Sequence, residues 1–277
     1  GAYTIQVYRL GYYGGTGGRL VASTGNLTGI TQPACTVTNT ATRLVECRWT
    51  TRYTLAVGAD WTSGLYVAKL RLNSNGKESP VFFVVRNDAS TAKILFQSSF
   101  TTSAAYNRYG GYSLYDFSST GGLRAYKVSF DRPSAELEEY SNLLRYEYNM
   151  IRWLESQGYD VSYVTNLDVH TNPSRLSQHK VLLDAGHNEY WSLEMRNAVE
   201  NARNAGMHLA FFSANTAYWR VRFEPSTSGV ANRVMVCYKS ATPGDPVAPT
   251  YRFRDAPNNR PENALMGVMY IGDHGAL

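Results

Sequence analysis

The spacing of apolar residues changes near residue 88, and this change constrains the fold more than any other feature of the sequence. Before it, runs such as YTIQVYRL, GLYVAKLRL and PVFFVVR alternate or stay apolar over short stretches and are separated by Gly, Pro and Asn. Strands at this spacing, without helical patterns between them, predict an immunoglobulin-like β-sandwich. We therefore expect a sandwich domain at residues 1–88.

After residue 88, short apolar strands alternate with segments of helical periodicity. We expect strands at 93–97, 124–130, 161–164, 180–186 and 208–213, and helices at 136–157 and 193–205. Ser192 can cap the second helix by accepting a hydrogen bond from its first turn. Because strands that alternate with helices form parallel sheets, residues 89–277 are predicted to be an α/β domain with a mostly parallel, doubly wound sheet.

Charge and hydropathy exclude two classes of protein. The 277 residues carry a net charge of +5, but their Lys and Arg are scattered, without the basic runs of a nucleic-acid-binding surface. No apolar run reaches the roughly 18 residues that a membrane-spanning helix needs. We therefore expect neither a nucleic-acid partner nor a membrane span.

The cysteines leave the compartment open. Cys35 and Cys47 flank a Thr- and Asn-rich segment that reads as two strands and a turn, so their thiols can form a disulfide or stay reduced. Abundant Gly, Thr, Ser, Asn and Tyr with few Lys favour an extracellular or periplasmic protein over a cytoplasmic one. Cys237 is then unpaired and is predicted to be a buried strand residue.

Three polar loops follow predicted strands of the α/β domain. The first contains Tyr106, Tyr109, Tyr112 and Tyr115, the second is GHNEYW with His187 and Glu189, and the third is SANT with Asn215. Ligands of doubly wound sheets bind beyond the carboxyl ends of the strands. We therefore expect these loops to form one site.

Several chemistries fit these residues. The His-x-Glu pair lacks the second His or Cys that zinc favours. A carboxylate with phenolates instead suits a hard cation such as Fe³⁺, and the chain has 21 Tyr against 10 Phe and 5 Trp. His187 and Glu189 also fit a metal-free acid/base pair, or a structural role in which Glu189 caps the following helix. No Gly-x-Ser-x-Gly segment is present, which argues against a serine hydrolase.

Six stretches of the chain occur in the order in which one known family has them: TSGLYVAKL, VFFVVR, AAYNRYGG, GHNEYW, FFSANTAYWR and PENALMG. GHNEYW with the downstream Ser-x-Asn is the most specific of them. On these stretches, nearly the whole chain resembles the C-terminal region of the N,N-dimethylformamidase large (beta) subunit. The resemblance implies hydrolysis of a small N-substituted amide, and the doubly wound sheet is then expected to be glutamine-amidotransferase-like.

The same resemblance implies a mononuclear ferric site held by two tyrosines and one glutamate. Matched by motif, these are Tyr106 of the Ala-Tyr-Asn stretch, Glu189 of GHNEYW and Tyr66 of the Ser-Gly-x-Tyr strand. Such a ligand set would put Fe³⁺ between the sandwich and the α/β domain. Tyr66 also fits a tyrosine corner, a structural hydrogen bond of β-sandwiches.

Further residues near the metal follow from the resemblance as well. His187 and Asn215 match the family's His and Asn beside the metal, where they would orient substrate or steady the developing oxyanion. Glu262, in Pro-Glu-Asn, is the candidate for taking the proton of the attacking water. Glu262 also fits an ion pair with an arginine such as Arg260.

We therefore expect an iron-dependent amide hydrolase in which Fe³⁺ polarises the carbonyl and activates water. A non-catalytic extracellular binding or structural module, and a metal-free His/Glu hydrolase, are the alternatives. The chain starts directly in a predicted strand and stops at Leu277, soon after PENALMG, where relatives seem to continue. We expect it to be the remainder of a longer chain or a minimal member, and a homo-oligomer is the alternative assembly.

Overall fold

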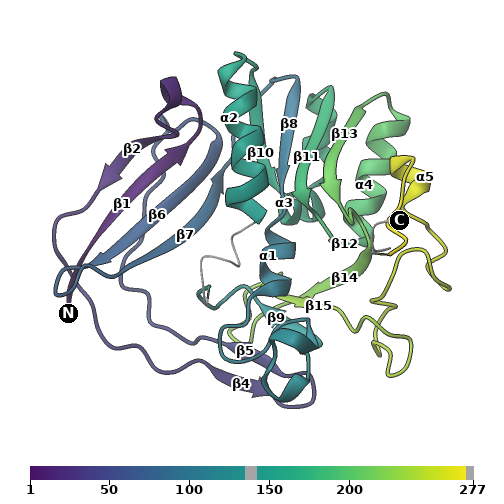
Figure 1. Cartoon of the computed structure of the whole chain (residues 1–277), viewed down its shortest axis with the longest axis horizontal. Helices are drawn as coiled ribbons and strands as arrows, with labels where there is room; N and C mark the ends of the chain where they lie inside the picture. Colours follow the sequence, from purple (N-terminus) through teal and green to yellow (C-terminus); the bar gives the residue numbers. More distant parts are fainter. Residues whose placement is uncertain (135–141, 273–277) are drawn as a thin grey trace, which may run out of the picture.

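The computed structural model describes residues 1–134 and 142–272. Its N-terminal part is an antiparallel sheet in the order β2-β1-β6-β7, with the short β3 beside β1 (Figure 1). These strands are β1 (Ala2–Leu10), β2 (Gly18–Ser23), β3 (Leu27–Thr28), β6 (Gly64–Leu72) and β7 (Glu78–Val85). One face of this sheet packs against the helix α2 (Tyr148–Ser156), and the other is covered by Leu55 and Trp61.

The remaining N-terminal strands form a separate hairpin, β4 (Thr36–Asn39) with β5 (Leu44–Glu46). A Cys35–Cys47 disulfide closes it, which decides between the two states expected from the sequence. Leu44 packs with Val234 and Val236 of the C-terminal half, so the hairpin does not face the five-stranded sheet. Within the described residues, 1–88 therefore contain a five-stranded antiparallel sheet and this separate two-stranded hairpin, an all-β arrangement compatible with the expected sandwich. Strand patterns predict strands, but not which partner a hairpin packs against.

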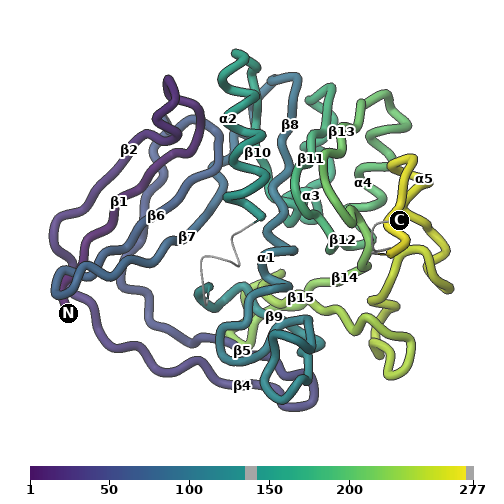
Figure 2. The backbone as a smooth tube through the Cα atoms, in the orientation of Figure 1, coloured from purple at the N-terminus to yellow at the C-terminus, as the bar shows by residue number. Residues whose placement is uncertain are grey.

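The central part is a parallel sheet in the spatial order β10-β8-β11-β13 (Figures 1 and 2). Its strands are β8 (Ile94–Ser98), β10 (Val161–Thr165), β11 (Val181–His187) and β13 (His208–Ala214). In chain order this arrangement is 2-1-3-4, the pattern of a doubly wound sheet. The mostly parallel sheet predicted from the sequence is thus present.

Helices connect these strands. They are α1 (Phe100–Tyr106), α2, α3 (Asn166–Thr171) and α4 (Leu193–Asn204), with the short α5 (Asn263–Met266) near the C-terminus. Ser192 Oγ accepts a hydrogen bond from Met195 N, so it caps α4 as predicted. Of the helix predicted at 136–157, residues 136–141 lie outside the described residues. The π-helix η5 (Leu143–Glu147) precedes α2 and turns Leu143 and Glu147 inward, while Leu144 and Tyr148 are half-buried.

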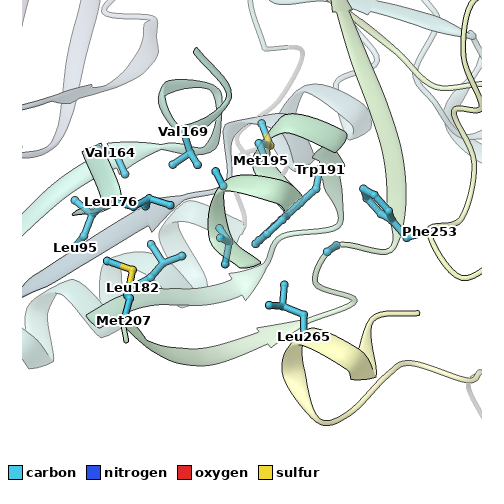
Figure 3. Close-up of a cluster of buried hydrophobic side chains, with 13 residues drawn as sticks. Leu95, Val164, Val169, Leu176, Leu182, Trp191, Met195, Met207, Phe253 and Leu265 are labelled. Carbon is cyan, nitrogen blue, oxygen red and sulfur yellow. The ribbon is translucent and has the colours of Figure 1, made fainter. Parts of the chain in front are cut away.

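A second, mixed sheet lies beyond the carboxyl ends of the parallel strands. Its order is β12-β14-β15-β9, from β12 (Tyr190–Ser192), β14 (Trp219–Glu224), β15 (Val234–Val236) and β9 (Lys127–Ser129). Cys237 follows β15 and is buried, although it lies just outside the strand. Figure 3 shows Trp191, Met195 and Phe253 in the core that joins α4 to this sheet and the C-terminal segment. Glu189 lies two residues before Trp191 of this core, so the core fixes the chain next to it.

Short 3-10 helices of one or two turns complete the described structure. They are η1 (Tyr13–Gly15), η2 (Asp116–Ser118), η3 (Thr120–Gly122) and η6 (Pro173–Gln178). Within the described ranges, no helix is long and apolar enough to cross a membrane.

Candidate functional site

The carboxyl ends of β8 and β11 form the switch point of the parallel sheet. These two strands are neighbours, while the strand that lies between them in the chain, β10, pairs with the other edge of β8. The segments that follow β8 and β11 lead to α1 and to β12, below this edge of the sheet in Figure 1. Doubly wound sheets bind their ligands at this position.

Glu189 is the centre of a buried polar and aromatic cluster at this edge. Its Oε2 accepts a hydrogen bond from the Tyr115 hydroxyl at 2.7 Å and lies 3.5 Å from the Tyr106 hydroxyl. Its Oε1 accepts from the Trp219 indole N–H at 2.9 Å, and its backbone N–H donates to Thr102 Oγ1 at 3.0 Å. Two phenols and an indole thus meet on one carboxylate.

A chain reversal brings Tyr115 to this cluster. The two glycines at 110–111 have φ values of 79° and 93°, which other residues rarely adopt. Beyond them the chain returns along α1, where Leu114 N donates to Ala105 O at 2.9 Å. The ring centroids of Tyr115 and Tyr106 then lie 4.3 Å apart. Sequence reasoning counted Tyr115 only as one of four loop tyrosines, and the Gly-Gly pair is the signal that pointed to its return.

Burial keeps both phenols protonated in the metal-free protein. It raises the pKa of the Tyr106 hydroxyl, and the nearby Glu189 carboxylate raises it further. The same two causes, in the same order, raise the pKa of the Tyr115 hydroxyl. A cation bound here would have to replace these protons, as metals do at their ligands.

A lysine absent from the sequence-based candidates lies against the same aromatic rings. Lys239 Nζ is 3.4 Å from the ring centroid of Tyr115 and about 5 Å from those of Tyr190 and Trp219. Tyr190 in turn donates its hydroxyl to the Tyr115 hydroxyl at 2.6 Å. Burial lowers the pKa of Lys239 to about 8. Its left-handed backbone (φ 55°) is not readable from the sequence, where it is an ordinary polar residue after a strand.

His187 and Asn215 reach the cluster from the ends of β11 and β13. His187 Nε2 lies 3.3 Å from Glu189 Oε2 and 3.3 Å from Asn215 Nδ2. Burial lowers the pKa of His187, so the ring is held neutral. Asn215 has a positive φ of 51°, a strained conformation that is common at functional sites. The structure thus brings together Tyr106, His187, Glu189 and Asn215.

Tyr66 is not part of this cluster. Its hydroxyl donates to Thr62 O at 2.6 Å, and its ring stacks between Trp61 and Phe83 in the core of the antiparallel sheet. Its neighbour Leu65 packs toward α2 and the parallel sheet. Because successive strand residues point to opposite faces, Tyr66 faces away from Glu189. Its contacts match the structural hydrogen bond that the sequence left as the alternative.

Glu262 also lies apart from Glu189. It is buried in an ion pair with Arg254, whose Nε lies 3.0 Å from Oε2. Arg260, the partner considered from the sequence, pairs with Glu200 instead. Glu262 and Asn215 line one cavity of about 240 Å³.

The donors around Glu189 match a hard metal ion better than zinc. In the described ranges, no three His, Cys, Asp or Glu side chains lie together as metal ligands. What converges on Glu189 Oε2 is the hydroxyls of Tyr106 and Tyr115, with His187 Nε2 beside them. Phenolate and carboxylate oxygens are hard ligands that suit Fe³⁺. The types of donor around Glu189 are therefore those that a ferric ion takes.

Comparison with known proteins places the chain in a family. No curated protein sequence is similar enough to be matched with it. A family model described as "N,N-dimethylformamidase beta subunit-like, C-terminal" matches residues 4–276. That match covers both the antiparallel sheet and the site around Glu189. The chain therefore belongs to the N,N-dimethylformamidase beta subunit-like, C-terminal family.

Proposed function

We propose that this chain is an amide hydrolase of the N,N-dimethylformamidase type that acts on a small N-substituted amide. Family membership supports the reaction class. The observation that carries the proposal is the convergence of the Tyr106 and Tyr115 hydroxyls on Glu189 Oε2 at the switch point of the parallel sheet.

Tyr106, Tyr115 and Glu189 would hold one ferric ion. When bound, the ion would supply Lewis acidity, polarising a substrate carbonyl and lowering the pKa of water. The indole N–H of Trp219 fixes the remaining oxygen of Glu189, so the carboxylate is held in one orientation. Fixed ligands of this kind preserve the geometry that a metal site needs.

The other side chains of the cluster would bind and orient the substrate. Asn215 presents its amide beside His187 Nε2, where it can donate a hydrogen bond to the oxygen that gains charge during attack. Neutral His187 can orient the attacking water through the same nitrogen. Glu262 is engaged by Arg254, so we do not assign it the water proton.

Partners and compartment follow as part of the proposal. The family name, with its reference to a beta subunit, supports a chain that works within a larger assembly. The Cys35–Cys47 disulfide supports an oxidising compartment, which is extracellular or periplasmic.

Iron binding tests the ligand set directly. Protein loaded with ferric ion should contain about one iron per chain and show a visible phenolate-to-iron absorption band. Tyr106→Phe, Tyr115→Phe and Glu189→Ala should each lose iron and the band, and should not release amine from N,N-dimethylformamide. Tyr66→Phe is the matched control, since it removes a buried phenol outside the cluster. This variant should keep its iron and its absorption band.

Two outcomes would contradict the proposal. Loss of iron in Tyr66→Phe, with retention in Tyr115→Phe, would return the ligand role to Tyr66. Activity that survives chelation and iron depletion would instead support the metal-free hydrolase, for which the 3.3 Å approach of His187 Nε2 to Glu189 Oε2 is the favouring observation.

A further inference from the structure

A buried polar network holds the loop that carries Glu189. Asn188, the residue before Glu189, is fully buried. Its Nδ2 donates to Asp184 Oδ2 at 3.0 Å, and its Oδ1 accepts from Asn166 Nδ2 at 3.2 Å. Its backbone N–H donates to Ser213 Oγ at 3.1 Å. The side chain of Asn188 is therefore held from two sides, and its backbone from a third.

Asp184 is an unusual partner for this amide because, in the described ranges, no cation compensates its carboxyl group. It is fully buried on β11, and its Oδ1 has no hydrogen-bond partner among the described residues. The charged group that acts on it is another carboxyl, Glu147. Burial raises the pKa of Asp184 well above its ordinary value, which keeps it a neutral acid.

Gln97 offers the acceptor that a neutral Asp184 needs. The two residues are register partners on the adjacent strands β8 and β11, so their side chains point to the same face of the sheet. Gln97 Oε1 is also buried without a partner. A proton on Asp184 Oδ1 directed at Gln97 Oε1 would satisfy both atoms, and would leave Oδ2 free to accept from Asn188.

We propose that Asp184, acting through Asn188, is a positioning residue that fixes the orientation of Glu189 in the site. Between them, Gly186 has a φ of 90°, and β11 ends at His187, directly before Asn188. The hydrogen bond from Asn188 to Asp184 ties the residue before Glu189 back to β11. Without it, Glu189 would lose its fixed approach to Trp219 and Tyr115. The role of this orientation in hydrolysis depends on the proposed function, but the orientation itself does not.

The indole N–H of Trp219 reports the orientation of Glu189 without metal or activity. In metal-free protein labelled with ¹⁵N-tryptophan, its resonance is identified by its absence in Trp219→Phe. Asp184→Ala should shift this resonance and speed its hydrogen exchange at least tenfold. Asp184→Asn, which still accepts from Asn188 and can donate to Gln97, should restore both to the wild-type values. Iron content and kcat should fall in Asp184→Ala and return to wild-type values in Asp184→Asn, with KM changing less.

Leu183→Ala is the matched control, because it removes a buried side chain from the opposite face of the same strand. It should lower the unfolding midpoint while leaving the Trp219 resonance in place. If Asp184→Ala does not fold, Asn188→Ala removes the same hydrogen bond from its other end and should shift the resonance. An unchanged resonance in the folded variant that lacks this bond would overturn the proposal, as would Asp184→Asn behaving like Asp184→Ala. If the wild-type protein binds no iron but the resonances behave as expected, the ferric site fails and the positioning role stands.

Discussion

Glu147 makes the stability of this protein depend on pH in a way that one substitution should remove. The residue is fully buried in η5, and its carboxyl group accepts hydrogen bonds from Ser99 N at 2.9 Å, from Ser99 Oγ at 2.6 Å and from Asn142 Nδ2 at 3.1 Å. Ser98 Oγ is a further donor. None of these partners is a cation, so ionisation leaves a buried negative charge.

The size of the effect follows from the two pKa values. Burial, only partly offset by these hydrogen bonds, raises the pKa of Glu147 from 4.5 to about 7. At about 1.4 kcal/mol per pH unit, this difference amounts to about 3 kcal/mol. Because the folded state binds the proton more tightly, the stabilisation is complete below pH 4.5 and is lost as the pH rises to about 7.

Urea unfolding of wild type and Glu147→Gln at pH 5, 6, 7 and 8 measures this contribution. The wild-type free energy of unfolding should fall between pH 5 and pH 8 by about 2 to 3 kcal/mol more than that of the variant. Titrating groups that do not interact with Glu147 are common to both proteins and cancel in the difference. Glu78→Gln, an exposed carboxylate on β7, should keep the wild-type dependence. Parallel curves for wild type and Glu147→Gln would refute the reasoning.

Two further substitutions and the reduction of the disulfide have expected outcomes. Tyr66→Phe leaves Thr62 O without its buried donor and should cost about 1 to 3 kcal/mol in urea unfolding, with iron content unchanged. Reduction of the Cys35–Cys47 disulfide opens a loop of 12 residues in sequence separation and should cost about 3 kcal/mol, seen as a lower urea midpoint in dithiothreitol. Arg254→Met leaves the buried Glu262 carboxylate without its ion-pair partner and should lower the free energy of unfolding by about 3 to 5 kcal/mol. The Trp219 indole resonance should not shift; a shifted resonance would link Glu262 to the cluster.

The parts of the fold that local patterns determine were predictable. Alternation in YTIQVYRL predicts a strand and β1 covers it, and Ser192 caps α4 because a serine before a helical stripe satisfies its first free N–H groups. The partner of the β4–β5 hairpin was not predictable, because Leu44 contacts Val234 and Val236, almost 200 residues later in the chain. Local spacing holds no information on such a contact, so the position of the hairpin could not be predicted from the sequence.

The site divides in the same way. The convergence of the loops after β8, β11 and β13 follows from the strand order, which local patterns suggested, and it brings Glu189, His187, Asn215 and Tyr106 within reach of one another. Lys239 could not be found in this way, because its place depends on a positive φ and on aromatic rings from other elements.

The choice between Tyr66 and Tyr115 shows why a motif match alone is a weak guide to a metal ligand. A motif gives the position of a tyrosine along the chain, whereas a ligand must also point at the other ligands. On β6, successive side chains point to opposite faces of the sheet. Leu65 packs toward α2, so the side chain of Tyr66 must face the other side. Tyr115 is free of that constraint, because the reversal at 110–111 lays its segment along α1 and its hydroxyl reaches Glu189 Oε2 at 2.7 Å. In the proposed ligand set, the second phenol is therefore supplied by a loop that folds back, and Tyr66 could replace it only if the register of β6 shifted by one residue.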